Sequence, residues 1–367
     1  MSAAPLATAR RATITDVARE AGTGKTSISR YLNGEMSVLS PELRARIEAA
    51  IQRLDYQPNQ MARGLKRGRN RLIGMLLADL TNPYTVEVLQ GVEAACHALG
   101  LMPLICHAAN EVEMERRYLQ LLTTYRVEGV IVNALGVREE TLRPVGAGGI
   151  PVVLVDRSVD GLVTDMVGLD NRGAAELGTR HLLEKGFDDI WFVVQPFEQV
   201  SSRNLREAAF REVLGNNGNG NGKAHARGRT LVLNLGDPEA VQASLAELDR
   251  AIEAAAGVAG GVDRQARRTV APGRRIALFA ANAPVALCLA LHLKARYGAD
   301  WQTRAALLSI DDPEWAELTG VTTIRQPTYE IGYRAVEFLH ERIEGVQTTA
   351  RDCLLPGELI VRASTSG

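Results

Sequence analysis

One short segment near the N-terminus constrains the fold of this chain more than any other. It reads Ala12-Thr-Ile-Thr-Asp-Val-Ala-Arg-Glu-Ala-Gly-Thr-Gly-Lys-Thr-Ser-Ile-Ser-Arg-Tyr-Leu-Asn33. Thr13 and Asp16 form a capping-box pattern that starts one helix, and Gly22 suits the left-handed position that ends it. A second helix is predicted from about Lys25 to Leu32. Two short helices joined by a tight turn form a helix-turn-helix, whose second helix fits the major groove of DNA.

The charge of the chain favours this interpretation over an ordinary helical hairpin on a globular surface. Ile28 and Leu32 face inward on the second helix, which leaves its polar and basic residues outside. Residues 1–71 hold 13 Lys/Arg and 6 Asp/Glu, whereas the remainder holds 29 and 37. A basic head on an acidic body indicates that only the head approaches a polyanion.

Composition and cysteine usage indicate where such a chain works. A chain of 367 residues is long enough for two or three domains, and 46% hydrophobic residues are typical of a soluble globular protein. The four cysteines lie far apart, which predicts free thiols in a reducing compartment. The N-terminus lacks the apolar core of a signal peptide, and no apolar run reaches the ~18–20 residues that span a bilayer. We therefore expect a cytoplasmic protein without a membrane partner.

The sequence predicts four segments. Residues 1–11 are a disordered lead-in, 12–56 a helix-turn-helix domain, 57–71 a hinge helix and linker, and 72–367 a two-lobed effector-binding and dimerisation domain. The last segment alternates continuous apolar runs with helical patterns, which is typical of α/β folds with doubly wound parallel sheets. Strands are predicted near Leu72–Ala78, Leu101–Cys106, Gly129–Asn133, Val152–Val155, Ile190–Val194, Ile276–Ala280 and Ala305–Ile310. The Gly/Asn-rich stretch that opens the 215–230 insertion is predicted to be a flexible loop, and 257–275 a connection; neither insertion is assigned a function.

Several motifs follow one another in a fixed order. They are Thr-Ile-x-Asp-Val-Ala at 13–18, Ser-Ile-Ser-Arg-x-Leu-Asn at 27–33, Tyr-x-Pro-Asn-x-x-Ala-Arg-x-Leu at 56–65, Asn-Pro-Tyr at 82–84, Val-Asp-Arg at 155–157, Asp-Asp at 311–312 and Thr-Thr-Ile-x-Gln-Pro at 322–327. In these motifs the chain resembles the lac-repressor (LacI/GalR) family of bacterial transcription regulators. The resemblance implies a helix-turn-helix head, a body like the periplasmic binding proteins, and a DNA-binding regulator expected to be a repressor. Within the family the chain looks most like members that respond to ketogluconate and related sugar acids.

The resemblance also implies which residues contact DNA. Lys25, Thr26 and Arg30 would face base edges, and Arg30 can pair bidentately with guanine. Phosphate contacts, which position the head without reading sequence, would come from Thr13, Ser27 and Asn33. The remaining implied positions in the head are Thr15, Ser29 and Tyr56. The family's Val-Ser is replaced here by Thr23-Gly24, so the second helix lacks a side-chain cap and the contact normally made by that serine is in doubt.

The segment that matches 58–66 folds, in the family, into a short hinge helix on operator DNA. Leu65 would be the apolar wedge that opens a base step in the minor groove. Asn59, Ala62 and Arg63 would line the groove beside it. From composition alone the segment could equally be a plain tether, and the motif favours the hinge.

Polar residues at strand ends predict an effector site in the body. Open α/β sheets bind ligands at the carboxyl ends of their strands. With the positions implied by the family, the candidate residues are Asp79, Asn82, Tyr84, Asp156, Arg157, Arg206, Asn282 and Asp311. Asp156 and Arg157 could instead form a structural ion pair, and Asn282 could be a helix N-cap. Because arginine forks suit carboxylates, Arg157 and Arg206 predict a sugar acid such as 2-ketogluconate or gluconate. A neutral sugar or another small metabolite is the alternative.

Other classes of protein fit the sequence less well. A transport-type solute-binding protein would share the body but would need a signal peptide and no basic helix-turn-helix. Gly146-Ala-Gly-Gly149 precedes a predicted strand, whereas a dinucleotide loop follows one. The histidines have no metal-ligand spacing, and His181 is expected to be packed within a helix. We therefore expect no enzymatic activity, no catalytic residue, no cofactor and no metal.

The expected partners are a palindromic operator, a small effector and a second copy of the chain. The tail Val361–Gly367 has no leucine heptad of the kind that forms tetramers, so a homodimer is expected. Release of DNA on effector binding is the expected direction of control.

Overall fold

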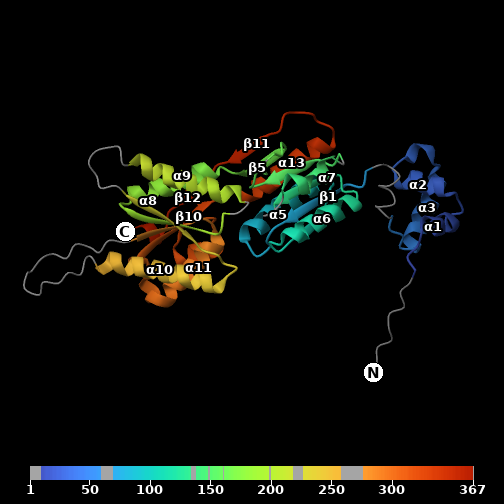
Figure 1. The fold of residues 1–367 in the computed structure, drawn as a ribbon. Helices are drawn as coiled ribbons and strands as arrows, with labels where there is room; N and C mark the ends of the chain where they lie inside the picture. Colours follow the sequence, from blue (N-terminus) through green and yellow to red (C-terminus); the bar gives the residue numbers. More distant parts are fainter. Residues whose placement is uncertain are drawn as a thin grey trace, which may run out of the picture. The chain divides into compact units, whose positions relative to one another are not determined.

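The computed structural model describes residues 10–58, 69–133, 138–147, 149–159, 161–197, 200–217, 226–257 and 276–366. It divides the chain into two compact units, Met1–Asn70, called the head below, and Arg71–Gly367, called the body. Figure 1 shows the elements of both units. Several predictions lie outside the described residues: the lead-in at 1–9, most of both predicted insertions, and the hinge contacts Asn59, Ala62, Arg63 and Leu65.

The described part of the head, residues 10–58 and 69–70, contains three α-helices packed around a small core. Its elements are α1 (Ile14–Glu20), α2 (Lys25–Leu32), the 3-10 turn η1 (Met36–Val38) and α3 (Pro41–Arg53). The predicted capping box is confirmed, because Thr13 and Asp16 cap each other's backbone at the start of α1. Gly22 has a φ of 60°, in the left-handed region that ends α1. The apolar core comprises Val17, Ala18, Ala21, Ile28, Leu39, Ile47 and Ala50.

Lobe 1 of the body is built on a parallel sheet in the order β11-β5-β4-β3-β1-β2. Its strands are β1 (Leu72–Leu77), β2 (Met102–His107), β3 (Gly129–Asn133), β4 (Val152–Val155), β5 (Asp165–Leu169) and β11 (Asp352–Leu355). Its helices are α5 (Pro83–Leu99), α6 (Val112–Thr124), α7 (Glu139–Ala147) and α13 (Thr328–Ile343). Two apolar clusters, one with α5 and α13 and the other with α6 and α7, cover the faces of this sheet.

Lobe 2 repeats this arrangement with the order β12-β10-β9-β8-β6-β7. Its strands are β6 (Asp189–Val194), β7 (Arg227–Val232), β8 (Ile276–Ala280), β9 (Ala305–Ile310), β10 (Thr322–Arg325) and β12 (Glu358–Ile360). Its helical elements are α8 (Asn171–Glu184), α9 (Ser201–Asn217), α10 (Pro238–Gly257), α11 (Ala283–Tyr297), η2 (Gly298–Thr303), α12 (Glu314–Thr319) and η3 (Ala363–Thr365). The predicted α/β class with two doubly wound parallel lobes is confirmed, with β12 as one antiparallel strand at the edge.

The chain passes between the lobes after β5, after β10 and after β11. The strands after β5 build lobe 2 as far as β10, but α13 and β11 return to lobe 1 (Figure 1). These elements complete the first sheet from the far end of the sequence.

Of two further sequence predictions, the start of one loop is wrong and the burial of His181 is confirmed. The predicted loop at 215–222 begins too early, because α9 continues to Asn217. The helix persists there because Phe210 and Leu214 pack over Gly228 on the neighbouring strand. His181 is buried as predicted, with its Nε2 atom 2.8 Å from the Thr365 hydroxyl oxygen. Among the described residues, the helices are all too short or too polar to cross a membrane.

Candidate functional site

Helix α2 presents the polar face predicted to contact DNA. Its side chains alternate between the core and solvent: Ile28 is fully buried, while Lys25, Thr26 and Arg30 are exposed. Gly24 is the N-cap and supplies no side-chain hydrogen bond, as its identity predicts. The side chains at the base-reading positions implied by the family therefore do not contribute to the core of the head.

The other predicted DNA contacts have roles within the head as well. The Thr13 hydroxyl donates to Asp16 Oδ2 at 2.6 Å, and Tyr56 packs half-buried against the head core. Thr15, Ser27, Ser29 and Asn33 are half-buried. Thr13 and Tyr56 therefore also stabilise the fold of the head.

Sequence analysis missed Glu35, which lies close to two predicted DNA contacts. Its Oε2 atom is 4.0 Å from Arg30 Nε, and its Oε1 atom accepts a hydrogen bond from Asn33 Nδ2 at 3.5 Å. A carboxylate in this position lowers the positive potential around both side chains.

A cleft of about 1110 Å³ lies between the two lobes of the body. All of the predicted effector residues line it, namely Asp79, Asn82, Tyr84, Asp156, Arg157, Arg206, Asn282 and Asp311. Lobe 1 supplies the first five of these residues and lobe 2 the last three. The structure therefore brings the predicted residues together in one cavity.

Two aspartates occupy equivalent places in the two lobes. Asp156 follows β4 and Asp311 follows β9, the strands with the same position in the two sheet orders. Both have left-handed backbones, with φ of 66° and 79°. Their amides donate to the neighbouring strands, at Val167 (3.0 Å) and Ile324 (2.9 Å). A strained backbone of this kind is uncommon for a residue other than glycine and clusters at functional sites.

Arg206 reaches from lobe 2 toward lobe 1. Its Nε donates to Asn171 Oδ1 and its Nη1 to the Ala281 carbonyl, both at 2.6 Å. Its Nη2 lies 3.9 Å from Asp156 Oδ1. The described contacts of Asp156 thus include an ion pair with Arg206 and none with Arg157, so the structural Asp156–Arg157 pair is not formed.

Several polar atoms in the cleft are buried without a hydrogen-bond partner among the described residues. They are the Tyr84 hydroxyl, Asp156 Oδ1, Nε and Nη1 of Arg157, and Gln326 Oε1. Buried polar atoms are nearly always paired in folded proteins, because an unpaired one loses its hydration without compensation. Such a set in one cavity indicates a site for a polar ligand that supplies both donors and acceptors.

Burial changes the ionisation of two of these groups. It raises the pKa of the Tyr84 hydroxyl well above its usual range, and the nearby Asp156 and Asp311 raise it further. Tyr84 therefore stays neutral and can donate a hydrogen bond to a ligand. Burial also lowers the pKa of Arg157, an effect that Asp156 opposes. An anionic ligand group beside Arg157 would favour the charged guanidinium.

The remaining predicted residues combine structural roles with their place in the cleft. Asn282 caps α11 through its Oδ1, as the alternative interpretation predicted, while its Nδ2 donates to Gln195 Oε1 at 2.7 Å. Asp79 Oδ1 accepts from the amide and hydroxyl of Thr81. Asn82 caps α5. Local caps thus fix the orientation of side chains at the rim of the cleft.

Two further residues line the cleft that were not predicted, although the sequence contains a signal for each of them. Gln195 directly follows β6, so the rule on strand ends applies to it. Gln326 lies in the Thr-Thr-Ile-x-Gln-Pro motif, and its Nε2 donates to Asp311 Oδ1 at 2.5 Å. It occupies the crossing between β10 and α13, which no local pattern shows.

The polar face of the head and the cleft of the body define a DNA-binding protein with a small-molecule site. Residues 13–59 match the bacterial regulatory proteins of the lacI family, and 70–221 match the periplasmic binding proteins and sugar binding domain of the LacI family. Residues 179–365 match a periplasmic binding protein-like domain.

Curated relatives cover almost the whole chain. The HTH-type transcriptional regulator PtxS of Pseudomonas aeruginosa is 41% identical over 367 residues, which is 100% of this chain and 99% of that protein. The regulator KdgR of Bacillus subtilis is 32% identical over 355 residues, 96% of this chain and 97% of that protein. Among solved structures, the lac repressor dimer bound to operator and the anti-inducer ONPF has a TM-score of 0.74 at 22% identity, covering 98% of this chain and 100% of that one.

The chain belongs to the lacI family of bacterial regulatory proteins. The resemblance to the lac-repressor family drawn from the motifs is thereby confirmed. The protein is a DNA-binding transcriptional regulator, and these relatives are named as regulators and not as enzymes.

Proposed function

We propose that the protein is a dimeric repressor whose affinity for a palindromic operator is lowered by a sugar acid in the cleft, such as 2-ketogluconate or gluconate. The observation that carries the effector class is the Arg157 guanidinium, whose buried Nε and Nη1 atoms have no partner among the described residues. A carboxylate accepts two parallel hydrogen bonds from such a fork. A neutral sugar has no carboxylate that could accept both of these hydrogen bonds at once.

The rest of the cleft suits the hydroxyl groups of the same ligand. Asp156 Oδ1 and Gln326 Oε1 are acceptors without a hydrogen-bond partner among the described residues, and the neutral Tyr84 hydroxyl can donate or accept. In this proposal Arg206 and Asp311 bind from lobe 2, while Asp79, Asn82 and Asn282 shape the rim. A ligand bonded to both lobes changes the position of one lobe relative to the other. The affinities for effector and for operator are therefore coupled reciprocally.

On the DNA side, two heads of a dimer would bind the two halves of the operator. Lys25, Thr26 and Arg30 would read bases, and Thr13, Ser27 and Asn33 would position the head on phosphates. The hinge contacts, Leu65 as wedge with Asn59, Ala62 and Arg63, complete the proposed interface in the minor groove.

A titration tests both halves of this proposal. The purified full-length protein is added to its own upstream intergenic DNA at two salt concentrations, with and without 2-ketogluconate. Tight binding that weakens with salt and with the sugar acid is the expected result. Binding that 2-ketogluconate leaves unchanged would contradict the effector. Failure to select any palindrome from random DNA would contradict the operator.

Arg157→Gln should weaken the binding of 2-ketogluconate by about 10- to 100-fold, because a hydrogen bond to a charged group contributes about 1.5–3 kcal/mol. Neutral glucose should not lose affinity, since it has no carboxylate to pair. Calorimetry on both ligands measures the difference. Arg180→Gln, an equal change at an exposed arginine on α8, is the matched control. Equal losses for the acid and the neutral sugar would rule out a carboxylate at Arg157.

Arg30→Lys should reduce discrimination between the operator and unrelated DNA by about 1–3 kcal/mol, the contribution of one bidentate pair to guanine. Lysine keeps the charge but lacks the planar fork, so non-specific binding should stay the same. Fluorescence anisotropy with operator and scrambled duplexes measures both quantities. The control is Arg19→Lys, at an exposed position on α1. A variant that loses affinity equally for both duplexes would show that Arg30 contacts phosphate instead.

A further inference from the structure

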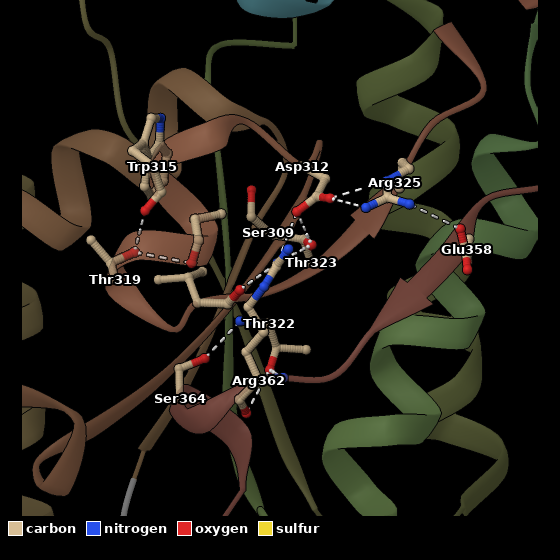
Figure 2. Close-up of polar contacts among 12 residues, drawn as sticks. Ser309, Asp312, Trp315, Thr319, Thr322, Thr323, Arg325, Glu358, Arg362 and Ser364 are labelled. Carbon is tan, nitrogen blue, oxygen red and sulfur yellow. Dashed lines mark hydrogen bonds and ion pairs between the residues drawn. The ribbon is translucent and has the colours of Figure 1, made fainter.

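Asp312 lies next to the cleft residue Asp311 but is not among the residues that line the cleft. Its side chain is only 6% exposed, and Figure 2 shows it at the centre of a polar cluster. Its Oδ1 accepts from the Thr323 hydroxyl at 2.7 Å and pairs with Arg362 Nη1 at 2.8 Å. Its Oδ2 accepts from Nε and Nη2 of Arg325, at 3.0 and 2.8 Å. Both oxygens of Asp312 are therefore fully engaged.

The partners of Asp312 come from segments that meet at the lobe crossings. Thr323 and Arg325 belong to β10, and Arg325 immediately precedes the crossing residue Gln326. Arg325 also pairs with Glu358, the first residue of β12 after another crossing, at 3.4 Å (Figure 2). Arg362 follows β12 and donates to the Val321 carbonyl at 2.9 Å. Asp312 thus joins the end of β9 to β10, β12 and the C-terminal segment.

The neighbouring Asp311 needs support of this kind. Its φ of 79° is unfavourable for a residue other than glycine, and such a conformation persists only where the surroundings fix it. Its carboxylate accepts two hydrogen bonds: from the backbone amide of Ala283, at the start of α11, at 2.8 Å, and from the side-chain Nε2 of Gln326 at 2.5 Å. A small rotation of the backbone at 311–312 would move the Asp311 carboxylate away from both donors.

We propose that Asp312 is a positioning residue of the effector cleft: clamped by Arg325 and Arg362, it fixes the left-handed backbone that aims the Asp311 carboxylate at Ala283, Gln326 and the ligand. The part that concerns the ligand rests on the proposed function. The part that concerns Asp311 can be tested without any ligand.

The ligand-free test is hydrogen exchange at the Ala283 amide in the full-length protein. Asp312→Asn keeps the shape of the side chain but removes the charge that holds two arginines. We expect the Ala283 amide to exchange about tenfold faster, which is the effect on local opening of weakening one hydrogen bond. Core amides in β8 should be unchanged. Glu358→Gln, which removes only the outer contact to Arg325, is the matched control and should leave Ala283 unchanged.

Two outcomes of this test would overturn the proposal. Unchanged exchange at Ala283 in Asp312→Asn would show that Asp311 holds its position without Asp312. Equal acceleration at Ala283 and in β8 would show that Asp312 stabilises lobe 2 as a whole and does not position Asp311.

The ligand test is a double-mutant cycle with 2-ketogluconate, using Asp312→Asn, Asp311→Asn and the double variant. If Asp312 acts through Asp311, Asp312→Asn should lower the affinity for 2-ketogluconate by about tenfold when Asp311 is present. The same substitution should lower it by less than about twofold in the Asp311→Asn background. The same loss in both backgrounds would overturn the proposal. If the unmodified protein does not bind 2-ketogluconate, the effector assignment fails, and exchange at Ala283 still decides the role of Asp312.

Discussion

Gly91→Ala should lower the melting temperature by about 6 °C, because the new methyl group has no room between α5 and α13. A Cβ atom at Gly91 would lie 2.0 Å from the Tyr329 carbonyl oxygen and 2.9 Å from the Tyr333 amide nitrogen. Backbone, and not the tip of a flexible side chain, would have to move. Overpacking of this kind costs about 3 kcal/mol, at about 2 °C per kcal/mol for a unit of this size.

The reciprocal position gives an independent check. A Cβ at Gly332 would lie 2.0 Å from the Val88 carbonyl oxygen, so Gly332→Ala should destabilise by a similar amount. Gly215→Ala in α9 is the control, because nothing lies within 4 Å of its added Cβ. That variant should be stabilised by up to about 1 kcal/mol through helix propensity. Calorimetric melting of the three variants measures the series, and a Gly91→Ala protein that melts with the wild type would show that the helices can separate freely.

The close contact of these helices matters for the cleft. Helix α5 begins beside Tyr84, and α13 begins just after Gln326. At the start of α13 the Thr328 hydroxyl donates to Glu87 Oε2 at 2.6 Å. The glycine pair therefore fixes the spacing between a cleft residue of lobe 1 and a lobe crossing. Variants that force the helices apart should also weaken effector binding.

How much of the fold the sequence predicts depends on where a strand lies. Runs such as Leu72–Leu77 and Ala305–Ile310 are apolar throughout because both faces of a central parallel strand are buried. Strands β5, β7, β10, β11 and β12 were not predicted, because their sequences, such as Thr-Thr-Ile-Arg in β10 and Asp-Cys-Leu-Leu in β11, mix polar and apolar residues. The return of α13 to lobe 1 depends on contacts more than 200 residues apart, such as Thr328 with Glu87, which no local pattern contains.

The candidate site divides in the same way. Asp156 and Asp311 could be predicted from their place after apolar strands. The pairing of the two arginines could not be predicted, because it depends on side-chain geometry across the cleft. Arg206 forms an ion pair with Asp156, whereas Nε and Nη1 of Arg157 have no hydrogen-bond partner among the described residues. The role of Glu35 could not be predicted either, because its contacts with Arg30 and Asn33 depend on how the chain turns after α2.

Asp165 forms ion pairs that connect β5 to α13 and to the chain before β11 in lobe 1. Its side chain is fully buried at the start of β5. Arg342 of α13 donates Nε and Nη2 to the two carboxylate oxygens, both at 2.8 Å. Arg351, which precedes β11, donates its amide at 2.9 Å and its Nη2 at 3.0 Å. Burial alone would raise the pKa of Asp165, but the hydrogen bonds from the arginines outweigh it and hold the pKa well below its usual range.

Asp165→Asn should lower the free energy of unfolding at pH 7 by about 3 kcal/mol, since it removes one partner of a buried ionic cluster whose arginines are partly exposed. Because the pKa is depressed in the folded state, the contribution of Asp165 is complete above the unfolded value of about 3.9 and is lost as the pH falls below it. The gap between wild type and Asp165→Asn should therefore stay constant from pH 7 to about 5 and narrow below about pH 4. Urea unfolding across this range measures the gap. A gap of the same size at pH 3.5 and pH 7 would show that the amide disrupts packing and that the charge of Asp165 does not hold β11 and α13 in place.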